Sequence, residues 1–366
     1  MIYKKYELPE YPCTADMWDA IAKSNKPIVV YGMGNGADKL ISRLSAYGVT
    51  VSDFFASDGF VRGQLFHGMR VLSYSEIREK YEDFVVLVSF GSSREEVLEI
   101  LVGLDREVDM YLPDMPVAGE DEYFDKDFYN ANYDSLLSAY NSLSDDTSRE
   151  VFASVVNYKL FGRLDALLCR CSTTEEIYSL LPTDNITEVI DAGAYNGDTV
   201  REAIRFFPSL KLVYAIEPDP KTYKRLLKYT NTVDFPIVKP INGAVWSECG
   251  EGSFLSSGNR NSSVNSTASF EHKAASVPLL TVDSLDCHAD YIKYDVEGAE
   301  YEALVGSDAV ISECKPSLLV SAYHRSRDIF SLVSYLRGKY PFYNIYMRRT
   351  RCVPAWELNL VLVKKD

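Results

Sequence analysis

The chain has 366 residues, 46% hydrophobic and 25% charged, which is an ordinary composition for a soluble globular protein and a length that favours two domains. Its 38 basic and 53 acidic residues give a net charge of −15, which argues against nucleic acid and anionic membranes as partners. Seven cysteines without a Cys-x-x-Cys pair argue against a disulfide framework or structural zinc, and because no apolar run approaches about 18 residues, we expect a cytoplasmic protein without a membrane span.

The first predicted unit, residues 25–115, alternates apolar runs with helical patterns, which is typical of a small parallel, Rossmann-like α/β domain. Its first apolar run ends in three closely spaced glycines, Gly32, Gly34 and Gly36. Such a turn is a weak match to a dinucleotide-binding fingerprint. A nucleotide or sugar-nucleotide site at these glycines and a scaffold or homodimerisation domain both remain open. Strands are predicted within 27–31, 49–58 and 84–90, and helices within 37–48 and 94–104.

The second predicted unit, residues 116–183, has a different pattern. Pro113, Pro116 and Gly119 mark the end of the first unit. Beyond them, helical spacing with acid-rich turns continues to about Leu181. We therefore predict a helical connector that packs on one or both α/β units.

The third predicted unit, residues 184–366, returns to alternating strands and helices. Its last two apolar runs face each other across a loop, which predicts a terminal antiparallel β-hairpin. A polar tract at 256–269 is interpreted either as a surface loop or as a substrate lid. The one candidate basic patch, Arg348, Arg349 and Arg351, is expected along a loop. Strands are predicted at 186–191, 212–217, 237–241, 290–295, 317–323, 344–349 and 358–364, with helices near Glu300 and over 328–340.

The turn after the first strand of this unit carries acids around glycines. The strand ends at Asp191, the turn contains Gly193 and Gly197, Asp198 follows, and the next strand ends at Glu217. The glycines let a ligand approach the backbone, and the acid on the neighbouring strand can accept both hydroxyls of a ribose. An acid at the helix start would repel a diphosphate but suits the sulfonium and amino group of S-adenosyl-L-methionine. We therefore predict S-adenosyl-L-methionine as the cofactor.

The predicted cofactor site spans the ends of three strands, and the segment after the third strand is expected to contact adenine. The residues predicted to bind the cofactor are Asp191, Gly193, Ala194, Tyr195, Asn196, Gly197, Asp198, Thr199, Glu217, Pro218, Asp219, Asn242, Gly243 and Ala244.

A third motif follows the predicted strand at 290–295, where Lys293, Asp295 and Glu297 would lie at the carboxyl edge of the sheet. Together, DAGAYNGDT, EPDP and IKYDVEGAE resemble the three motifs of the FkbM family of S-adenosylmethionine-dependent methyltransferases, and the resemblance covers about 184–366. It implies a class I methyltransferase sheet with a terminal hairpin, preceded by the Rossmann-like domain and the connector. It also implies O-methylation of a sugar or polyketide-type hydroxyl.

Methylation of an alcohol is helped by a base that removes its proton. His324 is the first candidate because its ordinary pKa lies near neutral pH. Asp295 and Glu297 are the second candidates, as base or as orienting groups, and Lys293 would pair with them or steady the alkoxide. Asp295, Glu297 and His324 also match an oxygen-rich magnesium site, but an ion pair with Lys293 explains the same residues, so we predict no metal.

Two other functions stay open beside an O-methyltransferase acting on a sugar, glycan or glycosylated natural product. One is a nucleotide-sugar-binding or NAD-linked protein of polysaccharide biosynthesis whose carboxy-terminal unit is not catalytic. The other is a scaffold without enzymatic activity. Asp198 and the segment 295–300 favour the methyltransferase.

Overall fold

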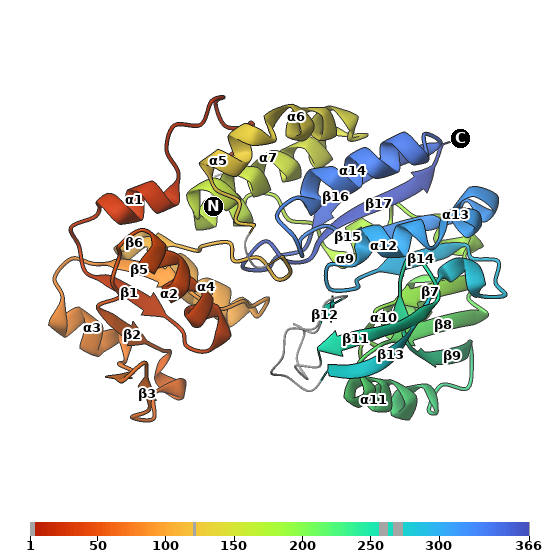
Figure 1. The fold of residues 1–366 in the computed structure, drawn as a ribbon, viewed down its shortest axis with the longest axis horizontal. Coiled ribbons are helices and arrows are strands. Elements are labelled where there is room, and N and C mark those ends of the chain that lie inside the picture. The colour runs from red at the N-terminus through yellow and green to blue at the C-terminus, as the bar shows by residue number, and fades with distance from the viewer. Residues whose placement is uncertain (1–3, 120–121, 256–262, 266–273, 366) are drawn as a thin grey trace.

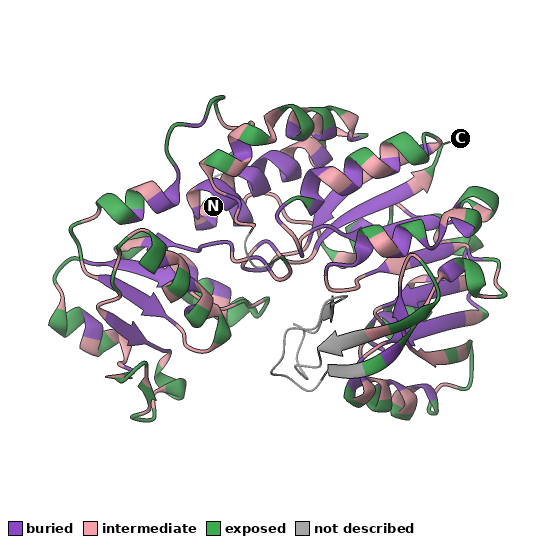
Figure 2. Cartoon of the chain, viewed as in Figure 1, coloured by how far each residue is buried: buried purple, intermediate pink, exposed green. Residues whose placement is uncertain are grey.

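Two α/β units lie at opposite ends of the molecule, and a layer of helices bridges them (Figure 1). The computed structural model describes residues 4–119, 122–255, 263–265 and 274–365. The interiors of both sheets are buried, while the outward faces of their helices are exposed (Figure 2). None of the helices in these ranges is long and apolar enough to span a bilayer.

The amino-terminal sheet is parallel throughout, with strand order β2-β1-β5-β6. All four residues of its central strand β1 are buried, as expected for a parallel sheet covered by helices. Strand β6 was not predicted, because three residues are too few to give a pattern. The elements are α1 Met17–Lys23, β1 Ile28–Tyr31, α2 Asn35–Ala46, β2 Asp53–Phe55, η1 Asp58–Phe60, β3 Leu65–Phe66, β4 Met69–Arg70, α3 Tyr74–Lys80, β5 Val85–Val88, α4 Glu95–Glu107 and β6 Asp109–Tyr111.

The glycines of the amino-terminal turn have a packing explanation. A Cβ on Gly32 would lie 2.6 Å from Oγ of Ser89, and one on Gly36 would lie 2.0 Å from the carbonyl oxygen of Ser89. Close approach of the turn to the end of β5 therefore requires glycine at both positions without any ligand. A Cβ on Gly34 would meet open space, although its φ of +98° favours glycine.

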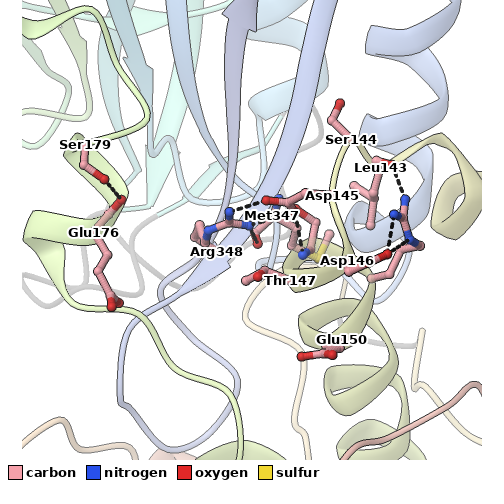
Figure 3. A network of polar contacts seen from close by, with 12 residues as sticks. Leu143, Ser144, Asp145, Asp146, Thr147, Glu150, Glu176, Ser179, Met347 and Arg348 are labelled. Atoms are coloured by element: carbon pink, nitrogen blue, oxygen red, sulfur yellow. Dashed lines mark hydrogen bonds and ion pairs between the residues drawn. The ribbon is translucent and has the colours of Figure 1, made fainter.

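Within the described part of the connector, five helices link the two units: α5 Lys126–Ala131, α6 Tyr133–Ser142, α7 Asp146–Phe161, α8 Leu164–Leu168 and α9 Thr174–Tyr178. Helix α7 is buried along most of its length and packs against β16. At its start, Asp145 accepts a hydrogen bond from Arg348 at 2.6 Å (Figure 3). Ser148 Oγ accepts one from the backbone N–H of Met347 at 2.9 Å. The connector is thereby anchored to the terminal hairpin.

This anchoring corrects the expected basic patch. Arg348 and Arg349 lie in strand β16 rather than in a loop, and they are only 7% and 1% exposed. Arg349 donates to the carbonyl of Leu167 at 2.5 Å. Arg351 follows the strand and pairs with Glu95. The three arginines therefore hold structural units together instead of forming a polyanion-binding surface.

The carboxy-terminal sheet has the strand order β16-β17-β15-β14-β7-β8-β9. Its strands are parallel except β17, which runs antiparallel to both β15 and β16, so the predicted α/β class and terminal hairpin are confirmed. The elements are η2 Thr183–Asn185, β7 Glu188–Ala192, α10 Asp198–Phe206, β8 Leu212–Glu217, α11 Pro220–Thr230, β9 Ile237–Asn242, η3 Val282–Ser284, β14 Tyr291–Tyr294, α12 Glu300–Val305, α13 Asp308–Cys314, β15 Ser317–Ser321, α14 Asp328–Lys339, β16 Tyr343–Arg349 and β17 Leu358–Lys364.

A smaller sheet is inserted between β9 and β14, with order β10-β13-β11-β12. Its strands are β10 Ala244–Val245, β11 Gly250–Leu255, β12 Ser263–Asn265 and β13 Ala274–Leu280. The polar tract expected to be a loop or lid thus includes a strand, and its remaining residues, 256–262 and 266–269, lie outside the described residues.

Candidate active site

A cavity of about 480 Å³ opens at the carboxyl ends of the central strands of the large sheet. Strand ends of β7, β8, β9 and β14 form one side of its wall, which is the usual place for a ligand in an open α/β sheet. The wall also includes residues distant in sequence, Ser93 and Val117 from the amino-terminal region and Thr350, Arg351, Trp356 and Glu357 from the hairpin loop. The volume suits a small-molecule ligand.

The predicted glycine turn forms part of this wall. Gly193 has φ +90°, and a Cβ there would lie 1.9 Å from the carbonyl oxygen of Asp295. Gly197 has φ +86°, and its Cβ would lie 2.3 Å from the ring of Tyr229. Both positions therefore require glycine for conformation and for space. Between them, Tyr195 lines the cavity in a left-handed conformation with φ +45°.

Glu217 closes the turn from the end of β8. Its Oε2 accepts the backbone N–H of Tyr195 at 2.9 Å, and its Oε1 accepts that of Asp219 at 2.8 Å. Burial raises the pKa of Glu217 to about 7 despite these two hydrogen bonds. The carboxylate is held rigidly at the cavity wall and keeps lone pairs available for the hydroxyls of a ribose.

Asp219 and Asn242 have mainly structural contacts. Asp219 caps helix α11, where its Oδ1 accepts the backbone N–H groups of Lys221 and Thr222, both at 2.8 Å. The side-chain amide of Asn242 donates to the carbonyl oxygen of Glu217 at 2.8 Å, which ties β9 to β8. Gly243 and Ala244 line the cavity directly after it.

Asp191 is buried behind the turn at 1% exposure, and neither of its carboxylate oxygens has a hydrogen-bond partner. Burial raises its pKa to about 7, and the nearby acids Asp198 and Asp295 act in the same direction against the effect of Lys293. An unpaired buried carboxylate is costly, and such groups cluster at functional sites.

Lys293 and Asp295 form an ion pair at the end of β14. The Lys293 Nζ lies 3.2 Å from Oδ2 of Asp295 and donates to Oγ1 of Thr199 at 2.9 Å. Oδ1 of Asp295 accepts hydrogen bonds from Ser321 at 3.0 Å and Tyr323 at 3.2 Å. Burial alone would raise the pKa of Asp295, but Lys293 and His324 outweigh it and lower this pKa to about 2. Asp295 is therefore a fixed anion and a poor proton acceptor.

His324 lies behind the cavity wall at 1% exposure, with carboxylates around its ring. Its Nδ1 is 2.9 Å from Oε1 of Glu300, and its Nε2 is 3.5 Å from Oε2 of Glu297 and 3.6 Å from Oδ1 of Asp295. Each of these contacts is an ion pair between the imidazole and a carboxylate. Burial lowers the pKa of His324, but Glu300 and the other two acids raise it further, to about 10.

Glu297 reaches the cavity from a strained backbone position. Its φ is +54°, it lines the cavity, and its side chain is 29% exposed. Burial raises the pKa of Glu297 to about 8, and His324 partly offsets this. Among the acids of this motif, Glu297 combines access to the cavity with a pKa near neutral pH.

The residues that could hold a metal ion differ from the set considered in the sequence analysis, which predicted no metal. Among the described residues, the ligand atoms that lie within 4.8 Å of one another belong to Asp295, Glu300 and His324, and Glu297 is not part of the group. Oε1 of Glu300 already accepts the backbone N–H of Val296 at 3.0 Å.

The structure brings most of the predicted residues to one cavity. Those on its wall are Gly193, Tyr195, Asp198, Thr199, Glu217, Pro218, Asp219, Gly243, Ala244, Lys293, Asp295 and Glu297. Those outside the wall are Asp191, Ala194, Asn196, Gly197, Asn242 and His324. The sequence places Glu300 at a helix start within the third motif but does not indicate its contact with His324. Tyr323, Trp356 and Ser93 were not predicted, because the sequence carries no signal for them.

The carboxy-terminal unit has a central parallel sheet with an antiparallel terminal hairpin. A glycine turn follows one strand of this sheet, and an acid ends the neighbouring strand. These features define the class I methyltransferase fold. Residues 191–340 match the family model described as the methyltransferase FkbM domain. This match agrees with the resemblance that the three motifs predicted. The match and the chemistry of the cavity support S-adenosylmethionine as the cofactor.

Among solved structures, the methyltransferase FkbM from Methylobacillus flagellatus KT is similar over 98% of this chain and 94% of its own, with 20% identity and a TM-score of 0.68. That likeness extends the shared fold to the amino-terminal unit and the connector. Precorrin-6y C5,15-methyltransferase from Geobacter metallireducens GS-15 gives 13% identity and a TM-score of 0.34 over 52% of this chain and 87% of its own. A comparison with curated protein sequences gives no match.

Proposed function

We propose that this chain is an S-adenosylmethionine-dependent O-methyltransferase that acts on a hydroxyl of a sugar, glycan or glycosylated natural product. The observation that carries the proposal is the charge of the cavity wall, which has seven acidic and two basic side chains. The acids are Asp198, Glu202, Glu217, Asp219, Asp295, Glu297 and Glu357, and the basic residues are Lys293 and Arg351.

This charge distribution favours a cationic ligand over a diphosphate. Both basic side chains are already paired, Lys293 with Asp295 and Arg351 with Glu95. A nicotinamide dinucleotide or a nucleotide-sugar would bring a diphosphate against a wall with excess negative charge. The sulfonium and amino group of the methyl donor would instead be attracted to it.

The residues present fit the donor along the wall. Glu217 would hold the ribose hydroxyls, the turn at Gly193 together with Asp198 would hold the methionine part, and Ala244 lies where adenine is expected. When bound, this cofactor supplies a methyl group on a positively charged sulfur. The chain's own contribution is to align the acceptor oxygen with that methyl and to take up a proton.

Glu297 is the group we assign to the proton. With the cofactor bound, the acceptor oxygen would take the methyl group in exchange for its proton, and the Glu297 carboxylate would accept that proton. A base is most effective when its pKa lies near the working pH, and the pKa of about 8 for Glu297 meets this condition. His324, buried and held protonated, is assigned the positioning of Glu297 and Asp295.

No metal is required by this arrangement, because Asp295 is already neutralised by Lys293 at 3.2 Å. Dialysis against EDTA is expected to leave methyl transfer unchanged.

The remaining residues of the wall support a polyhydroxylated acceptor, since they include aromatic rings with hydroxyl and amide groups, among them Tyr323, Thr350 and Asn359.

Two measurements test the proposal. Calorimetry with S-adenosylmethionine is expected to show one site per chain, and tritium from the labelled methyl group is expected to appear in a carbohydrate acceptor. Absence of cofactor binding would refute the donor assignment. A labelled methyl group that alkali does not release would indicate a methyl ether. A methyl group that alkali releases would indicate a methyl ester and contradict O-methylation of a hydroxyl.

A further inference from the structure

We infer that the acceptor binds at the junction between the amino-terminal α/β unit and the carboxy-terminal sheet, with Trp356 as the side chain on which an uncharged sugar ring rests. This inference rests on the proposed function and specifies where its acceptor lies. It assigns the amino-terminal unit a part in substrate recognition that does not involve its own glycine turn.

The first observation is a backbone connection between the two units beside the cavity. Ser92, after β5, and Val353, in the hairpin loop, exchange two backbone hydrogen bonds of 2.7 and 3.0 Å. Glu95 follows Ser92 closely in the sequence and Arg351 precedes Val353 closely, and these two side chains form an ion pair. The two flanking residues Ser93 and Arg351 both line the cavity. The hairpin loop is therefore held at the cavity by the amino-terminal unit.

The second observation concerns Gly91 and Trp356. A Cβ on Gly91 would lie 2.3, 2.6 and 2.9 Å from three carbons of the six-membered ring of Trp356. Gly91 is not among the glycines with positive φ, so its backbone conformation does not demand glycine. Its lack of a side chain instead makes room for the indole, which also lines the cavity. This contact fixes the tryptophan as part of the wall.

The third observation is the position of the linker that leaves the amino-terminal sheet. Val117 lines the cavity, and the backbone N–H of Ala118 donates to the carbonyl of His324 at 2.9 Å. A Cβ on Gly298 would lie 2.6 Å from Cβ of Ala118. The linker thus packs against Gly298 and His324 of the carboxy-terminal unit and contributes Val117 to the cavity wall.

The chemistry of this part of the wall indicates the class of acceptor. The residues after β7, β8 and β9 are assigned to the cofactor. Among the remaining residues of the wall, we assign Ser93, Val117, Tyr323, Thr350, Arg351 and Trp356 to the acceptor. Aromatic rings pack against the apolar face of a ring, while hydroxyl groups satisfy its polar edge. Because the Arg351 guanidinium is paired with Glu95, this wall favours a neutral sugar over a sugar phosphate.

The experiment uses the full chain, labelled S-adenosylmethionine and a panel of methyl glycosides of glucose, galactose and rhamnose. Four variants are compared with the wild type: Trp356→Ala, Trp356→Phe, Gly91→Ala and the control Gly103→Ala. Gly103 lies in α4 with nothing within 4 Å of the added Cβ. Cofactor affinity is measured by calorimetry and folding by the thermal midpoint, so that acceptor effects are separated from both.

We expect Trp356→Ala to raise KM for the methylated glycoside about 10-fold or more, and Gly91→Ala to raise it by a smaller factor, with cofactor Kd changed less than about 2-fold. Trp356→Phe is expected to retain most of the affinity, and Gly103→Ala to behave as the wild type. Unchanged KM in both Trp356→Ala and Gly91→Ala would overturn the inference. If the wild type binds the cofactor but neither binds nor methylates any glycoside, the sugar assignment alone would be overturned. If the wild type does not bind the cofactor, the proposed function itself would be refuted.

Discussion

The Nδ1 atom of His324 lies 2.9 Å from Oε1 of Glu300, and both side chains are only 1% exposed. Glu300 holds the imidazole as a buried cation, because this contact and the nearby Glu297 and Asp295 raise the pKa of His324 to about 10. A protonated imidazole cannot accept the proton of an alcohol. The first candidate of the sequence analysis is therefore assigned a positioning role, and Glu297 becomes the predicted base.

The pH dependence of kcat/KM tests this assignment. A base must be deprotonated to act, so kcat/KM should rise with pH and level off above the pKa of about 8 of Glu297. Glu297→Gln should lower kcat at least about 100-fold and abolish this rise. The exposed Glu313→Gln in α13 serves as the control. A rise that persists unchanged in Glu297→Gln would contradict the assignment.

Replacement of His324 should act through Glu297. The positive charge of His324 lowers the pKa of Glu297, so removing it should raise this pKa further. In His324→Gln the rise of kcat/KM is expected to move to a pH above 8 while remaining present. His288→Gln, at an exposed position, is the matched control. Complete loss of the rise in His324→Gln would show instead that the histidine itself titrates as the base.

Asp191→Asn should stabilise the protein at neutral and alkaline pH in the absence of cofactor. Burial raises the folded-state pKa of Asp191 from 3.8 to about 7, so its contribution to stability is full below pH 4 and is lost as pH rises through about 7. This difference corresponds to about 4 kcal/mol for full ionisation. Asparagine stays neutral, but its amide also lacks partners, so we expect a net gain of about 1–2 kcal/mol.

Thermal unfolding checks this expectation at two pH values. The midpoint of Asp191→Asn should exceed that of the wild type at pH 8 and match it at pH 4, and the exposed Asp234→Asn should show no such difference. Equal midpoints at pH 8 would mean that the Asp191 carboxylate has a partner in solution. Weaker cofactor binding by the same variant is expected, because the acidic end of the cavity loses charge.

Glu217→Ala should weaken the binding of S-adenosylmethionine about 10-fold or more, since hydrogen bonds to a charged group are worth about 1.5–3 kcal/mol. The two backbone N–H groups of Tyr195 and Asp219 would also lose their acceptor. Glu99→Gln, on the exposed face of α4, controls for a change of net charge. Calorimetry measures the affinity, and full affinity of Glu217→Ala would remove the ribose assignment.

Much of the fold could be predicted from local sequence. The run 212–217 is apolar and uninterrupted up to its terminal acid, and strand β8 occupies that range. The two final apolar runs face each other across one loop, which suffices to predict their antiparallel pairing. Strand β6 escaped prediction because three residues give no period, and β12 lies in a polar tract that resembles a loop.

The wrong and missing features depend on tertiary contacts. Arg348 and Arg349 look like surface charges in the sequence, yet both are buried. Arg348 bonds to Asp145 there, and Arg349 bonds to the carbonyl of Leu167. The raised pKa of Glu297 arises from burial, which its sequence neighbours do not reveal. The contribution of Ser93 to the cavity requires two units to meet across more than 200 residues of sequence, and no local pattern encodes that meeting.

The most direct test of the account is a pair of calorimetric titrations of the full chain, one with S-adenosylmethionine and one with NAD. The acidic cavity wall predicts saturable micromolar binding of the methyl donor and no measurable heat of binding for the dinucleotide. Saturable binding of NAD by a chain that does not bind S-adenosylmethionine would contradict the central claim.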